Sequence, residues 1–459
     1  MGEHSDFISS EGFFPSQIGE MVSIFVHYDH PLLKLKRTLD WEQLEAVMVN
    51  HWQKAGKNVA GGRGLSFPVS FYVRLLVLMS VRCLNSREME QYISESVVAR
   101  LFLEISEPLR FQLKDHSSIA RAQAGLGEAG FKEVNQLMVK EAVRLGFATT
   151  DILSSDTTVQ EPAIGYPHEA GILRAVAQRI GRVAAKLKQA GVEKAEELSG
   201  KVKEVLKSAK HYYLFAKAGE EKTEALAEIV RYSEELMRGS EELIESGMAQ
   251  TSKVVKSGIK KLKELGKFTK ELMPQIKGWM ETGVVAAEKL LHAGISEARA
   301  IVKNKTGKKT EFGLKWLINR IGGGYVFGEV VGAHSSEGGM PLLGLAAYRK
   351  LFGKQATPDM SVYDRGGDST RTRRKLEKEG VKKVGIQPKG KKQWSIVEAD
   401  QTIAISQRGK TEGVIGTLKS ERYEFNRSRH RTNESLKAAG QRSMLGMNLN
   451  NILRDLVGK

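Results

Sequence analysis

The chain has 459 residues, of which 41% are hydrophobic, so it is long enough for a substantial core spread over two or three structural units. Its 71 lysines and arginines outnumber its 54 acidic residues, and the net charge of +17 favours a polyanionic partner, with nucleic acid ahead of a membrane surface. A generally basic soluble protein would show the same excess. The single cysteine, Cys83, excludes an internal disulfide and a zinc site built from thiolates.

Neither a membrane span nor a secretory leader is expected. The chain has no run of about twenty uninterrupted apolar residues. Its start, Met1-Gly-Glu-His-Ser-Asp, lacks a basic segment followed by an apolar core. We therefore expect a cytoplasmic protein without a membrane partner.

Residues 1–145 are predicted to form a helical domain. In the run 69–105, apolar residues such as Leu75, Leu78 and Leu84 recur near one helical stripe. Asp115-His-Ser-Ser supplies polar capping groups for a further helix. Compact helical modules of this kind often bind DNA or mediate dimerisation, although the pattern alone predicts only a folded helical domain.

Residues 146–167 begin a different pattern. Ile152 and Leu153 run into Ser154-Ser-Asp156, which predicts a short buried strand that ends at Asp156. Because ligands and chemistry in open α/β sheets collect at the carboxyl ends of strands, Asp156 is a better catalytic candidate than Asp151 at the start of the strand.

Residues 168–305 are rich in Lys, Glu, Ala and Leu and contain no aspartate. Apolar residues recur at steps of three and four in 172–187 and 254–265, as in amphipathic helices. Recurrent glycines argue against one uninterrupted coiled coil, so we expect a bundle or hairpin of helices. For this net basic insertion, a solvated spacer or oligomerisation arm is favoured over direct DNA contact.

Residues 306–459, together with 146–167, are predicted to form a mixed α+β core. Strands are expected at 310–319, 324–332, 360–364 and 381–387, the first two as a hairpin. Helices are expected at 341–352, 370–379 and 402–419. This order predicts a mixed sheet flanked by helices, interrupted near its beginning by the insertion and completed by a C-terminal helix.

Three carboxylates far apart in the sequence are candidates for one metal site: Asp156, Asp364 and Glu412. Asp364 opens the turn Asp-Arg-Gly-Gly, where two glycines and a basic side chain would let a phosphate backbone approach. Carboxylate oxygens suit hard cations such as Mg²⁺, and two such ions about 3.5–4 Å apart ease attack on a phosphodiester. Each acid alone has an ordinary explanation as a turn or cap residue.

The third acid lies in the most specific pattern. Arg408 and Glu412 are four residues apart and Lys419 follows after seven, so all three fall near one helix face. A surface ion pair between Arg408 and Glu412, worth about 0–1 kcal/mol, would explain the first two equally well. The basic residues around Glu412 favour the functional interpretation, because they would hold phosphates beside the acid. They are Lys410, Lys419, Arg422, Arg427, Arg429 and Arg431.

Together these residues resemble those of DDE transposases of the bacterial insertion-sequence type. That family has a first aspartate on a strand, a second before a basic residue and glycine, and then Arg, three residues, Glu, six residues, Lys. Asp156, Asp364 with Arg365, and the trio of Arg408, Glu412 and Lys419 fit this order and the final spacing. Residues 74–86, Phe102-Leu-Glu-Ile and Asp115-His-Ser-Ser-Ile are similar to the helical domain that precedes the catalytic core.

Two features depart from the family pattern. The tyrosine that often stands three residues before the arginine is replaced by Ile405. Relatives commonly carry a β-rich insertion between the second and third acids, whereas here the long excursion follows Asp156 and is helical in pattern.

The resemblance implies an RNase-H-like catalytic core and cleavage and strand transfer at transposon ends. Two Mg²⁺ ions, with Mn²⁺ as a substitute, would be held by Asp156, Asp364 and Glu412, while DNA phosphates would be oriented by Arg365, Arg408 and Lys419. The implied partners are double-stranded DNA, as transposon ends and target, and a second copy of the chain in a homodimer, all at the nucleoid.

Two other interpretations stay open. One is a catalytically silent descendant that still binds DNA, against which the intact acids argue. The other is a helical scaffold that uses its insertion for assembly. A scaffold has no need of Asp-Arg-Gly together with Arg-Gly-Lys-Thr-Glu.

Overall fold

In the computed structural model, the described residues are 26–57, 59, 67–105, 116–247, 252–302, 310–390, 392–426 and 428–458. The chain divides into two compact units. The first comprises Met1–Glu161, Lys315–His430 and Glu434–Lys459. The second comprises Pro162–Leu314 and Arg431–Asn433.

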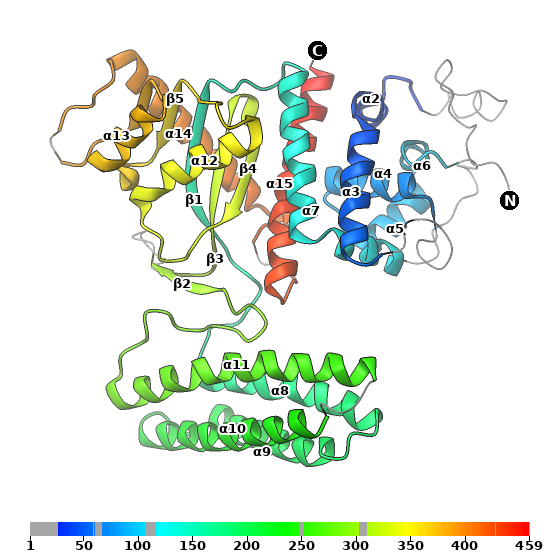
Figure 1. Cartoon of the computed structure of the whole chain (residues 1–459), viewed down its shortest axis with the longest axis vertical. Helices are drawn as coiled ribbons and strands as arrows, with labels where there is room; N and C mark the ends of the chain where they lie inside the picture. Colours follow the sequence, from blue (N-terminus) through cyan, green and yellow to red (C-terminus); the bar gives the residue numbers. More distant parts are fainter. Residues whose placement is uncertain are drawn as a thin grey trace. The chain divides into compact units, whose positions relative to one another are not determined.

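A mixed sheet forms one part of the first unit (Figure 1). Its strands in spatial order are β4 (Val326–Val330), β3 (Thr310–Arg320), β1 (Ile152–Gln160), β5 (Met360–Tyr363) and β6 (Lys383–Ile386). β5 runs parallel to both β1 and β6, whereas β3 and β4 form an antiparallel hairpin. The mixed α+β class expected from the sequence is confirmed.

Helices cover the two faces of this sheet. Buried apolar residues join one face to α12 (Met340–Phe352) and α13 (Thr370–Lys378), with Tyr363 of β5 among them. On the other face, Met360 and Val362 of β5 pack against Ala404 of α14 (Glu398–Leu418). Alternate residues of β5 therefore belong to different layers, as the pleat of a strand requires.

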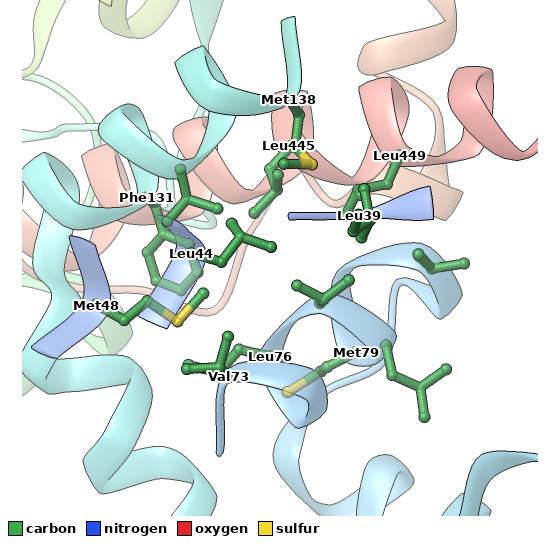
Figure 2. Packing of buried hydrophobic residues seen from close by; sticks show 14 of the residues in the cluster. Leu39, Leu44, Met48, Val73, Leu76, Met79, Phe131, Met138, Leu445 and Leu449 are labelled. Atoms are coloured by element: carbon green, nitrogen blue, oxygen red, sulfur yellow. The ribbon is translucent and has the colours of Figure 1, made fainter. Parts of the chain in front are cut away.

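The helical part at the N-terminus shares a core with α15 (Asn433–Val457). In α4, every residue from Phe71 to Val81 is buried, so it is the central helix. Figure 2 shows Val73, Leu76 and Met79 of this helix facing Leu445 and Leu449 of α15 across the core. The surrounding helices are α2 (Pro31–Thr38), α3 (Trp41–Lys54), α5 (Ser86–Glu95), α6 (Val97–Phe102) and α7 (His116–Arg144).

A buried polar contact joins α7, α15 and the edge of the sheet. The amide of Asn448 donates to Asn135 Oδ1 at 2.7 Å and to the carbonyl of Val326 at 2.6 Å. Because all three groups are withdrawn from water, each partner satisfies a group that would otherwise destabilise the fold. In Figure 1, α7 and α15 accordingly run side by side between the sheet and the N-terminal helices.

The described part of the second unit contains four long helices: α8 (Glu169–Gln189), α9 (Ala195–Leu214), α10 (Glu220–Gly247) and α11 (Lys253–Thr282). Each packs on the next, α11 packs back on α8, and their apolar faces form one core. The expected helical bundle is confirmed. A Cβ atom on Gly258 of α11 would lie 2.7 Å from Leu187 of α8, so a glycine here permits the close approach of the two helices.

Several details differ from the expectations. β1 continues four residues beyond Asp156 to Gln160, because Thr157, Thr158 and Val159 keep the chain in the sheet. A short strand that was not expected, β2 (Arg299–Val302), pairs antiparallel with residues 310–313 of β3. The proposed cap Asp115 lies outside the described residues.

No single helix among the described residues has the length and apolar composition to cross a membrane. Only taken together would α4 and α5 have both, and these two helices are bent by 99° relative to each other.

Gly440 of α15 offers a test of the packing of α15 on the sheet. A Cβ atom there would lie 2.5 Å from the Trp316 ring, which is fully buried and whose indole N–H donates to Gln160. We expect Gly440→Ala to lower the free energy of unfolding by about 1–3 kcal/mol because the rigid ring has to move. Urea denaturation would measure the change.

The matched control is Gly416→Ala in α14, where a Cβ atom meets nothing within 4 Å. Replacing an exposed helical glycine by alanine is expected to be neutral or to stabilise by up to about 1 kcal/mol. Equal destabilisation by both changes would contradict the assignment of the Gly440 effect to contact with Trp316.

Candidate active site

Parallel pairing of β1 and β5 sets the positions of the first two candidate acids. Ile152 lies opposite Met360, and Ser154 lies opposite Val362. Asp156, in the middle of β1, and Asp364, directly after β5, are each two residues further along, so the same register carries them to neighbouring positions. Two aspartates separated by 208 positions in the sequence are thus neighbours across one strand pair.

Contacts on either side of Asp156 show which face of the sheet it occupies. The Thr411 hydroxyl of α14 donates to Ser154 Oγ at 2.7 Å, whereas the Thr157 hydroxyl lies 3.3 Å from Glu337 Oε1 on the opposite face. Because side chains alternate along a strand, Asp156 shares the face of Ser154, which α14 covers. Asp364 shares the face of Val362, which packs against Ala404 of the same helix.

Glu412 follows Thr411 in α14, so it stands beside the residue that touches β1. With about 100° of rotation per residue, Arg408, Glu412 and Lys419 lie within about 40° of one another, on the flank of the buried face. Glu412 Oε1 accepts a bond from Arg408 at 3.0 Å, and both side chains are about half exposed. The ordinary surface ion pair considered from the sequence is therefore present.

A surface hollow lies beside this ion pair. Arg408 and Glu412 line it together with residues from β5, β6, the segment between β6 and α14, and the middle of α14: Tyr363, Gly385, Gln387, Trp394, Ala404, Ile405 and Gly409. Ile405, at the position where a tyrosine was noted as frequent, is 62% exposed. Glu412 therefore borders the hollow, whereas Asp156 and Asp364 do not line it.

The turn after β5 holds Asp364 in place. Its Oδ1 accepts the backbone N–H of Gly366 at 2.7 Å, and a Cβ atom on Gly367 would lie 2.5 Å from the Tyr363 ring. Arg365 is exposed in this turn. Glycine is therefore needed at position 367, and the turn presents one cation beside the carboxylate.

Asp368 braces the far end of the same turn. Burial by itself raises the pKa of its carboxyl, but bonds from the Lys389 N–H at 2.8 Å and from Arg373 Nε at 2.7 Å hold that pKa below its usual range. The Lys389 ammonium also donates to the Gly366 carbonyl at 3.2 Å. The loop that carries Asp364 is thus tied to the neighbouring β6 segment.

The remaining predicted cations lie in different settings. Lys419 is the C-cap residue of α14. Arg422 donates to Asn450 of α15 at 2.9 Å, which turns it toward the helical core, and Arg427 lies outside the described residues.

Metal coordination needs several ligands at one point. Across the described ranges, no group of three or more His, Cys, Asp or Glu side chains is arranged to hold a metal ion. Glu412 engages Arg408 instead. Among the described residues, Asp156 and Asp364 thus share a face of the sheet, and Glu412 does not complete a coordination shell with them.

Comparison with known families supplies an independent observation. Residues 20–124 match the model of a family described as Transposase domain (DUF772). This match supports a transposase family for the chain. No curated protein and no solved structure matched it.

The matched residues end within α7, and a transposase domain implies DNA as a partner and DNA processing as an activity in general terms. The three carboxylates lie outside the matched residues. Their roles rest on the geometry given above.

Glu337 is a residue near the aspartates that the sequence pattern did not single out. It follows β4 and accepts bonds from Lys315 Nζ at 2.6 Å, from the Thr157 hydroxyl and from the Tyr363 hydroxyl. Thr157 and Tyr363 are the immediate neighbours of Asp156 and Asp364. Glu337 therefore ties together the two strand segments that carry the aspartates, from the face opposite α14.

The Tyr363 hydroxyl is fixed as a donor in this cluster. Burial, and then the negative charge of Glu337 and its hydrogen bond, raise the pKa of Tyr363 well above its usual range, and Asp156 adds to the effect. Since Lys315 is 5% exposed, its ammonium depends on Glu337 for charge compensation. Only the folded sheet brings these side chains together, so no local sequence pattern marks Glu337.

We expect Glu337→Gln to lower the free energy of unfolding by about 1–3 kcal/mol, because the buried Lys315 ammonium loses its anion. Chemical denaturation would measure this. Glu329→Gln in β4 is the matched control: Glu329 pairs with Lys132 at the same 2.6 Å, but that lysine is 23% exposed. Its loss should cost less than about 1 kcal/mol. An equal loss of unfolding free energy in both variants would show that the burial of Lys315 does not determine the effect of Glu337→Gln.

Proposed function

We propose that the chain is a DDE transposase with an RNase-H-like core, which cleaves DNA strands at the ends of an insertion sequence and transfers them to target DNA. The observation that carries this proposal is the parallel register of β1 and β5, continued two residues to Asp156 and Asp364, on the sheet face that α14 covers. The same helix bears Glu412. The mixed sheet flanked by helices is the architecture that such a core requires.

The donor set fits hard divalent cations, because all three candidate ligands are carboxylates. Two Mg²⁺ ions, or Mn²⁺ in their place, would supply activation of the attacking oxygen and stabilisation of the departing one. To take part, Glu412 has to leave its pair with Arg408. That pair is half exposed and worth about 0–1 kcal/mol, so it presents little obstacle.

The side chains of this chain then have distinct tasks. Asp156 and Asp364 supply fixed negative charge on adjacent strands, and Glu412 adds the third carboxylate from the helix. Arg365, Arg408 and Lys419 would bind phosphate oxygens and hold the strand in line for attack. Water would first displace the 3′ oxygen from the phosphorus, and the freed 3′-hydroxyl would then attack a phosphorus of the target strand and release the target's own 3′ oxygen.

Synapsis of two DNA ends calls for two active sites, so a homodimer at the nucleoid completes the proposal. A catalytically silent DNA-binding descendant would share the fold and the transposase domain. Cleavage, rather than DNA binding, therefore distinguishes the two interpretations.

We expect the purified full-length chain to nick duplex DNA that carries the ends of its own insertion sequence, in Mg²⁺ or Mn²⁺ and not in EDTA. Asp156→Asn, Asp364→Asn and Glu412→Gln should each lower the cleavage rate by at least about 10²-fold, because charge stabilisation in the transition state is lost. Denaturing gels would measure cleavage, and mobility shifts would measure binding, which should be retained.

Glu398→Gln is the matched control, since Glu398 is an exposed carboxylate in the first turn of the same helix as Glu412. It should cleave at the unmodified rate. Undiminished cleavage by all three site variants would sink the assignment, and absence of cleavage in the unmodified chain with intact DNA binding would favour the silent descendant.

A further inference from the structure

Five lysines follow one exposed face of α11: Lys253, Lys256, Lys260, Lys263 and Lys267, here called the lysine row. Their spacing of three, four, three and four residues places them in one stripe along a helix. With a rise of 1.5 Å per residue, the row extends over about 21 Å.

Burial of the opposite face of α11 keeps the lysine row exposed to solvent. Val255, Ile259, Leu262 and Leu265 are buried in the core that the four helices share. Rotation of α11 about its axis would expose these residues, so the lysines cannot turn inward. The same burial means that α11 has no apolar face available for insertion into a lipid surface, which amphipathic membrane helices need.

Acidic partners for the row are missing on the neighbouring helix. α10 is acidic, with nine glutamates against three basic residues, yet its glutamates reach only the far half of α11: Glu241 pairs with Lys270 and Glu234 with Lys277. Within the described part of the bundle, no ion pair joins an acid to the lysine row.

Charge along α11 is consequently uneven. Residues 253–267 contain six lysines and one glutamate, a net charge of +5, whereas residues 268–282 contain two of each and are neutral. Like charges three or four residues apart destabilise a helix by about 0.2–0.5 kcal/mol per pair. A bound polyanion would convert this repulsion into attraction.

We propose that the lysine row binds the phosphate backbone of duplex DNA, as a second contact surface outside the active site. The choice of DNA as the polyanion rests on the proposed function, whereas the binding of a polyanion by the lysine row does not. A row of about 21 Å matches about six base pairs at 3.4 Å each. Lysine ammoniums are point charges that contact phosphates without reading base edges, so the contact is independent of sequence.

The test uses the full-length chain and a fluorescent duplex of random sequence, with binding titrated at several salt concentrations. The row variant is Lys256→Gln with Lys260→Gln and Lys263→Gln. The slope of log K against log salt is negative, and each lost phosphate contact should reduce its magnitude by about 0.9. For the row variant we expect a slope shallower by about 2.7, and weaker binding at low salt.

The control variant removes the same charge from the same bundle. Lys203→Gln, Lys207→Gln and Lys210→Gln change three exposed lysines of α9, also spaced by four and three residues. Its salt slope should change by less than about 1. Neither variant should lower the thermal midpoint of the unmodified chain, because each removes repulsion between like charges along its helix.

An unchanged slope in the row variant would overturn the inference, and so would equal loss in both variants, which would indicate net charge alone. Tighter binding of the unmodified chain to vesicles of anionic lipid than to the duplex would overturn it too. The salt slope reports DNA binding alone. Failure of DNA cleavage would therefore count against the active site and leave the lysine row untouched.

Discussion

Parallel pairing between β1 and β5 is the constraint on which the candidate active site depends. This pairing places residues 152–154 beside residues 360–362, although the sequence between them contains the whole helical insertion. Because a strand has a period of two, a slip of one residue in this register would send one aspartate to the opposite face. The site is thus a property of the register, and the helices that cover the sheet act by holding it.

The two faces of the sheet have different tasks at this point. On one side, Thr411 of α14 bonds to Ser154 and fixes the helix that bears Arg408 and Glu412. On the other side, Glu337 bonds to the neighbours of both aspartates and compensates the buried Lys315. The carboxylates therefore lie on strand segments braced from behind, which is the preorganisation that electrostatic catalysis needs.

The insertion is tolerated because it folds around a core of its own. Its helices bury their apolar faces against one another, so the excursion between β1 and β3 does not draw on the core of the first unit. The entropic cost of closing a chain grows only slowly with its length, and an insertion that is itself folded costs less than a flexible loop of equal length. A folded bundle between two strands is also a means of adding a surface, here a basic one, without altering the sheet.

The sequence by itself determined the kind and order of the elements. Strands 310–319 and 360–364, the helix near 402–419 and the helical insertion are local patterns of hydrophobic period, and the stripe of Arg408, Glu412 and Lys419 follows from helical spacing alone. Burial and pairing decided the rest. The unexpected strand β2 exists because β3 offers it hydrogen bonds, which no local period encodes.

Glu337 shows the same limit at the site. Its partners Thr157, Lys315 and Tyr363 come from three strands, and only the assembled sheet makes them neighbours. The sequence could nominate Asp156, Asp364 and Glu412 as separate acids. The ion pair between Arg408 and Glu412 follows from helical spacing within α14. The face that Asp156 and Asp364 share was decided by tertiary structure, because the distance between residues remote in sequence is set by strand register and helix packing.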